Sequence, residues 1–175
     1  IKHYEGEQPL FLKISFARPH SPYDPPQRIL EMYENIEIPA PAEGEWSKHI
    51  GKDITDPKAD SSAAFAQFST EYVKNTRKHY YAAVTFIDEQ VGRIVKALKE
   101  KGMYDNTIIC FTSDHGDMMG DHHSWRKTYA YEGSAAIPMI IKTPKDVEGV
   151  HCRGKVIENP VELRDILPTF LDAAG

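Results

Sequence analysis

The stretch Thr107-Ile-Ile-Cys-Phe-Thr-Ser-Asp-His-Gly-Asp117 joins an apolar run directly to a cluster of polar residues. Its first part is rich in β-branched and aromatic side chains, and such a run predicts a buried strand over residues 107–112. The strand ends abruptly at Ser113, where the polar cluster begins. In open α/β sheets ligands bind beyond the carboxyl ends of the strands, so a site is expected at this position.

Two further apolar runs predict strands of the same sheet. Residues 11–16 follow Pro9 and precede a proline-rich stretch, and residues 139–142 follow Pro138. Residues 156–161 are a candidate for a fourth strand. Continuous apolar strands separated by a helical segment are typical of sheets that are covered on both faces. The sequence therefore predicts an α/β fold with a mostly parallel central sheet flanked by helices.

Apolar residues spaced three and four apart predict helix within residues 62–101, either as one long helix or as two with a break near Asn75. Gly102 is placed to end this helix as a C-terminal cap. A short helix is expected within residues 27–33. Asp165 can begin a last helix, because aspartate is a favoured residue at helix starts.

The composition is that of a folded globular domain or a piece of one. Of the 175 residues, 41% are hydrophobic and 27% are charged, which argues against a disordered chain. The net charge of -5 argues against nucleic acid as the main partner. No apolar run approaches the roughly 20 residues that a membrane span needs. Residues 36–61 are interrupted by proline and glycine and predict a long surface loop excursion.

The polar cluster is a candidate metal site. Asp114 comes where the chain leaves the sheet, so its carboxylate is held at the sheet edge, and His115 adds a nitrogen ligand. Gly116 lets the backbone turn sharply behind them. Two ligands are fewer than a divalent ion needs, so the others must come from elsewhere. The alternative is a polar loop whose Asp and Gly residues only form turns.

Cationic and histidine side chains accompany this cluster. Arg126 and Lys127 form a candidate clamp for an anion, although a solvated basic pair has the same pattern. His20 follows the first predicted strand within a proline-rich loop, where a structural histidine is the alternative. Together, a metal, cationic donors and a histidine would stabilise negative charge on a tetrahedral group such as sulfate or phosphate.

As a set, these motifs resemble the sulfatase family of the alkaline-phosphatase-like superfamily. The resemblance rests on Asp114-His-Gly116, Gly120-Asp-His122, Lys127, Tyr131-Glu132 followed by Pro138, and Pro19-His-Ser-Pro22. Residues 81–98 and 161–175 are also similar to the family, so the resemblance covers most of the chain apart from the excursion. It implies hydrolysis of sulfate esters by a formylglycine nucleophile, with a calcium ion and several Lys and His side chains holding the sulfate.

The resemblance also implies roles for single residues. By matching position, Asp114 and His115 would be calcium ligands. Manganese or zinc stays open, because a histidine nitrogen is not the oxygen ligand that calcium prefers. Lys127 would bind a sulfate oxygen or the ester oxygen, and His20 would bind sulfate and help to protonate the leaving group. The residues implied in substrate binding are His122 and Arg126.

The nucleophile signature of the family, Cys/Ser-x-Pro/Ala-x-Arg, does not occur in this sequence. Cys110 is followed by Phe-Thr-Ser-Asp and Cys152 by Arg-Gly-Lys-Val. We therefore expect residues 1–175 to be the central and C-terminal part of a sulfatase catalytic domain, without its N-terminal nucleophile segment. Covalent catalysis needs the nucleophile, so the chain alone is expected to be inactive.

Two other functions share the same residues. One is a phosphonate monoester or phosphodiester hydrolase of the same superfamily, and the other is a non-catalytic relative that binds anions. The expected partner is a small-molecule or carbohydrate sulfate ester, with no nucleic acid and no membrane, and the oligomeric state is unknown from the sequence. A periplasmic or secreted bacterial location is the expectation that the resemblance favours.

Overall fold

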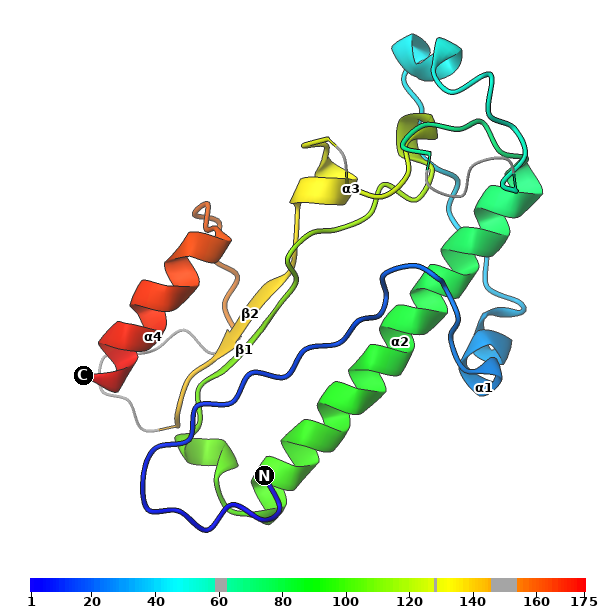
Figure 1. Ribbon diagram of the computed structural model, residues 1–175. Coiled ribbons are helices and arrows are strands. Elements are labelled where there is room, and N and C mark those ends of the chain that lie inside the picture. The colour runs from blue at the N-terminus through cyan, green and yellow to red at the C-terminus, as the bar shows by residue number, and fades with distance from the viewer. Residues whose placement is uncertain (59–62, 128, 146–153) are drawn as a thin grey trace.

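The computed structural model describes residues 1–58, 63–127, 129–145 and 154–175 (Figure 1). Its helices and strands are α1 (Gln27–Leu30), α2 (Thr70–Glu100), β1 (Ile109–Thr112), α3 (Glu132–Ala135), β2 (Met139–Lys142) and α4 (Ile166–Ala174). Single 3-10 turns cover Glu31–Tyr33, Glu45–His49, Tyr104–Asn106, Asp121–His123 and Leu163–Asp165. The short helix expected within residues 27–33 is thus present as α1 with the turn that follows it.

The predicted long helix forms as one continuous element, α2, with no break at Asn75. It begins at Thr70, later than the pattern suggested, where the Ser69 hydroxyl accepts a hydrogen bond from the Tyr72 N–H. It ends as expected at Gly102, which has a φ of 68°. Asparagine lowers helix propensity only mildly, so a single Asn does not interrupt a helix of this length. In the part of the chain that the structure describes, no helix could cross a membrane.

The strands β1 and β2 form one sheet, as predicted, but they run antiparallel. The register pairs Ile109 with Lys142 and Thr112 with Met139. The expectation of parallel strands is therefore wrong for this pair. A parallel pair needs a long crossover, usually through a helix, whereas the only described helix between these strands is the four-residue α3. The chain simply returns, so the segment between them lies at one end of the sheet.

Residues 11–16 do not form the predicted buried strand. The segment is extended and makes no ladder, and the Phe11 side chain is 78% exposed. Residues 156–161, the candidate fourth strand, are also unpaired and exposed. An apolar run shows what a segment tends to bury, but a strand also needs a neighbour for its backbone N–H and C=O groups. Within the described residues, neither segment has that neighbour.

A small core forms where α2 begins. Trp125 is 7% exposed, packs with Ala66 and Val73, and is in ring contact with Phe68. Its indole N–H donates to the Ala66 carbonyl at 3.2 Å. Its backbone N–H donates to the Ala64 carbonyl at 2.9 Å. This core fixes the chain immediately before Arg126 and Lys127, and so holds the predicted anion clamp against α2.

We expect Trp125→Ala to lower the free energy of unfolding by about 3–5 kcal/mol, because it empties the centre of this core and leaves the Ala66 carbonyl without its donor. Urea unfolding followed by circular dichroism measures the change. Val84→Ala, at a half-exposed position of α2, is the matched control and should change stability by less than about 0.5 kcal/mol. Equal effects of the two substitutions would contradict the proposed core.

Candidate active site

The polar turn, residues 113–117, lies directly beyond β1. The Nδ1 atom of His115 lies 2.7 Å from the Gly116 carbonyl. Since a carbonyl oxygen only accepts, Nδ1 carries the proton and Nε2 keeps its lone pair. That Nε2 lies 3.8 Å from Oδ2 of Asp114, whose carboxylate is exposed. A carboxylate oxygen and an imidazole lone pair thus face the same space.

His20 and Lys127 meet beside this turn, although they are far apart in the sequence. The Nδ1 atom of His20 lies 2.9 Å from the Ser21 carbonyl, so Nδ1 is the donor and Nε2 the acceptor. Nε2 lies 3.1 Å from Nζ of Lys127, which therefore donates to it. The His20 and His115 rings lie 6.0 Å apart. The predicted convergence of His20, Asp114, His115 and Lys127 is confirmed.

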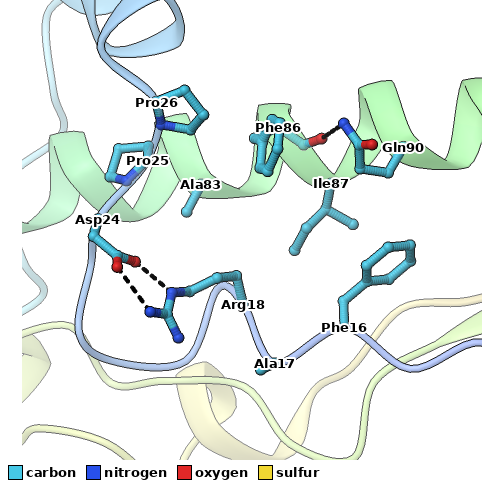
Figure 2. A pocket seen from close by; sticks show the side chains of 10 residues that line it. All are labelled: Phe16, Ala17, Arg18, Asp24, Pro25, Pro26, Ala83, Phe86, Ile87 and Gln90. Atoms are coloured by element: carbon cyan, nitrogen blue, oxygen red, sulfur yellow. Dashed lines mark hydrogen bonds and ion pairs between the residues drawn. The ribbon is translucent and has the colours of Figure 1, made fainter.

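The loop that carries His20 is held by an ion pair across its base (Figure 2). Arg18 donates two hydrogen bonds to the Asp24 carboxylate, one of them at 2.8 Å between Nη2 and Oδ2. Hydrogen bonding from Arg18 lowers the pKa of Asp24. Beneath this pair is a hollow of about 360 Å³ against α2, lined on the helix side by Ala83, Phe86 and Ile87. Its lining is mainly apolar.

Asp117 and Tyr23 are the functional residues that sequence reasoning missed. The Tyr23 hydroxyl donates to Oδ2 of Asp117 at 3.0 Å, and Oδ1 accepts the backbone N–H groups of Met119 and Arg126, each at 3.0 Å. Burial and the Asp117 charge raise the pKa of Tyr23, which stays protonated as a donor. Asp117 stood in the quoted cluster and could have been noticed. Tyr23 lies in a proline-rich loop, and no motif in the sequence marks it as a partner of Asp117.

The two residues implied in substrate binding lie in different surroundings. Arg126 has its backbone N–H on Asp117 and precedes Lys127, so it is close to the catalytic candidates. The contacts of His122 in the described residues are with the excursion and with Tyr131 rather than with His20 or Lys127. Its Nδ1 accepts from the Gly44 N–H at 3.1 Å, and its ring lies against Trp46.

The metal expectation concerns Asp114 and His115. Asp114 and His115 offer a carboxylate oxygen and a nitrogen lone pair, which is chemistry that fits a divalent ion. Among the described residues no group of three His, Cys, Asp or Glu side chains gathers closely enough to hold a metal. Two ligands leave most of a coordination shell to other groups. Metal binding at this turn and the identity of the metal therefore both stay predictions.

We expect the hydrogen bond between Tyr23 and Asp117 to couple the His20 loop to the polar turn. In a double-mutant cycle of Tyr23→Phe and Asp117→Asn, the free energies of unfolding should be non-additive by about 0.5–3 kcal/mol. The control cycle pairs Asp117→Asn with Tyr33→Phe, which removes a hydroxyl bonded to Thr85 instead. Additive effects in the first cycle would show that the two segments are held independently.

Comparison with known proteins places this site in a family. The family model described as Sulfatase matches residues 1–175. An arylsulfatase from Clostridium perfringens is 42% identical over 99% of the chain and 36% of its own length. A choline-sulfatase from Rhizobium meliloti is 34% identical over 98% of the chain and 32% of its own length. The chain thus spans about a third of these relatives.

A solved structure supports the same assignment at the level of the fold. The phosphonate monoester hydrolase SpPMH from Silicibacter pomeroyi superposes with a TM-score of 0.71, at 34% identity, covering 89% of this chain and 32% of that one. The α/β, alkaline-phosphatase-like fold class is confirmed, with the antiparallel β1–β2 pair as the local difference from our expectation. The family model, the relatives and the convergent residues agree: the chain belongs to the sulfatase family.

Proposed function

We propose that the whole protein to which this chain belongs hydrolyses sulfate esters of small molecules or carbohydrates. The observation that carries the proposal is the contact of 3.1 Å between Lys127 Nζ and His20 Nε2, beside the turn that holds Asp114 and His115. A sulfate ester carries negative charge on its terminal oxygens, and charge develops on the ester oxygen as the S–O bond breaks. A lysine, a histidine and a divalent ion together match that distribution.

In this proposal Lys127 supplies charge and hydrogen bonds. An ammonium group has three N–H donors, so one can be directed to His20 while others reach sulfate oxygens. The contact with His20 also orients the flexible lysine side chain before substrate arrives. An oriented donor costs little reorganisation in the transition state, which is the main source of such stabilisation.

His20 is proposed to act on the leaving group. With Nδ1 assigned as the donor to the Ser21 carbonyl, Nε2 accepts from Lys127, and on protonation of the ring it becomes a donor. When the ring is protonated, Nε2 releases the N–H of Lys127, and its proton can pass to the ester oxygen as the S–O bond breaks, so that the leaving group departs as a neutral alcohol. The His20 ring lies 6.0 Å from the ring of His115, one of the two candidate metal ligands.

Asp114 and His115 are the residues that would hold the metal, with calcium as the proposed ion and manganese or zinc as alternatives. A bound divalent ion would neutralise charge on the sulfate oxygens. The remaining ligands would come from outside the described residues. His115 is prepared for this role because the Gly116 carbonyl keeps the proton on Nδ1.

The nucleophile is proposed to come from another part of the whole protein, as the formylglycine that the family resemblance implies. Cys110 is unsuited to the role, because it lies within β1 outside the signature and burial raises the pKa of its thiol. Cys152 lies outside the described residues. We accordingly propose that residues 1–175 alone do not turn over sulfate esters.

A second function is supported by a specific observation. The similar structure from Silicibacter pomeroyi is named a phosphonate monoester hydrolase, so phosphonate or phosphate diesters are the alternative substrates. Both reactions would use Asp114, His115, His20 and Lys127. Parallel assays of 4-nitrophenyl sulfate and of a 4-nitrophenyl phosphonate monoester separate them. Turnover of neither by the whole protein would support the remaining alternative, a non-catalytic anion-binding relative.

We expect Lys127→Ala in the whole protein to lower kcat on 4-nitrophenyl sulfate by about 10²-fold or more, because it removes a charge donor to the transition state. The steady-state rate of 4-nitrophenol release measures the change. Stability should change little, because Lys127 contributes charge rather than packing. The matched control is Lys74→Ala on the exposed side of α2, which should keep the rate of the unmodified protein. An unchanged rate in Lys127→Ala would remove this residue from the site.

A further inference from the structure

Three aromatic rings gather beside the candidate active site. Trp46 lies 4.9 Å from His122 and is stacked on Tyr131 at 5.7 Å, with an angle of 19° between the ring planes. The His122 and Tyr131 rings lie 5.5 Å apart. Trp46 is 49% and Tyr131 is 38% exposed. We call these three residues the aromatic platform. Large aromatic side chains tend to be buried, so an exposed cluster of them invites a functional explanation.

The excursion is fixed against the 3-10 turn Asp121–His123 by hydrogen bonds. The His122 N–H donates to the Ala42 carbonyl at 2.7 Å, and the Ala42 N–H donates to Oδ1 of Asp121 at 3.0 Å. The Gly44 N–H donates to Nδ1 of His122 at 3.1 Å. Asp121 is itself paired with Arg77 of α2 at 3.1 Å. Residues 42–46 are therefore anchored, through His122 and Asp121, to the long helix.

The position of Trp46 is also built locally. Ser47 is completely buried, and its hydroxyl donates to the Gly44 carbonyl at 2.7 Å. A Cβ atom at Gly44 would lie 2.5 Å from Nε1 of Trp46, so only glycine lets the indole lie this close to the backbone. The exposed indole thus rests on an ordered turn, which lowers the entropy lost when a ligand binds to it.

The rim of the platform carries a hydrogen-bond donor. Because Nδ1 of His122 accepts from a backbone N–H, the proton of the neutral ring is on Nε2. The indole N–H of Trp46 lies against the backbone of Gly44. A sugar ring is apolar on its faces and polar around its edge, so it can stack on the aromatic rings while one of its oxygens accepts from Nε2 of His122. A plain aryl group has no oxygen to accept from this N–H.

The platform is joined to the polar turn through α3. Tyr131 immediately precedes α3, and the Gly116 N–H donates to the Ser134 carbonyl at 2.7 Å. A Cβ atom at Gly116 would lie 2.2 Å from the Gly133 carbonyl oxygen, so the turn and α3 are in direct contact. The platform is therefore linked, through α3, to the turn that carries Asp114 and His115.

We propose that the aromatic platform binds the sugar ring of a carbohydrate sulfate ester and so selects carbohydrate over aryl substrates. This inference rests on the proposed sulfate ester hydrolysis and names the part of the chain that would recognise the leaving group. Its specific content is that Trp46 contributes to the kcat/KM for sugars without taking part in the chemical step.

The test uses the whole protein and two readouts. The first is kcat/KM on 4-nitrophenyl sulfate and on the 6-sulfates of glucose, galactose and N-acetylglucosamine. The second is quenching of tryptophan fluorescence by the same sugar sulfates, which reports binding without hydrolysis. The variants are Trp46→Ala and Trp46→Phe. The matched control is Glu45→Ala, in the same turn, where the side chain is 88% exposed and pairs only with Lys48 among the described residues.

We expect Trp46→Ala to lower kcat/KM on at least one sugar sulfate by about tenfold, with the aryl sulfate and the Glu45→Ala control within about twofold of the unmodified protein. Trp46→Phe should recover part of the loss, since a ring face remains. Equal losses on aryl and sugar sulfates, or no loss on any sugar sulfate, would overturn the inference. If the unmodified protein hydrolyses no sulfate ester, the proposed function fails, and fluorescence quenching by the sugars still decides whether Trp46 binds them.

Discussion

The candidate active site depends on the carboxylate of Asp117. One oxygen accepts from the Tyr23 hydroxyl, and the other accepts from the backbone N–H groups of Met119 and Arg126. These contacts join the loop that carries His20, the polar turn after β1, and the segment that ends in Lys127. A partly buried carboxylate that accepts from three donors is strongly held, because leaving those donors unpaired would be costly. His20 and Lys127, which are proposed to react, are thus positioned by Asp117, which is not proposed to react.

Two further contacts extend this arrangement outward. Trp125 locks the chain ahead of Lys127 into the small core at the start of α2. Gly116 packs directly on the backbone of α3, which brings Tyr131 and the aromatic platform next to the polar turn. The apolar core holds the frame, and hydrogen bonds to backbone groups set the positions of the loops on it.

Two apolar segments of the chain are exposed although their patterning is that of buried strands. Residues 11–16 and 156–161 carry the patterning of buried strands, yet within the described residues they pair with nothing. The chain spans about a third of the sulfatase relatives that it matches. Strand patterning records a requirement for neighbours, and among the described residues only the strands β1 and β2 pair with each other to form a sheet. The helix α2 needs no such neighbour, since its backbone hydrogen bonds are internal.

By itself, the sequence determined the features that depend on local chemistry. The end of α2 at Gly102, the strands β1 and β2, and the polar turn with Asp114 and His115 all follow from periodicity, capping and turn residues close together in the chain. The family motifs added His20 and Lys127 as partners. Tertiary structure alone decided what depends on contacts between distant segments: the antiparallel pairing, the unpaired state of residues 11–16, the Tyr23 to Asp117 bond and the seating of Trp46 on His122. The physical reason is that a hydrogen bond or a ring stack needs two partners, and one-dimensional patterning describes only what each partner can offer.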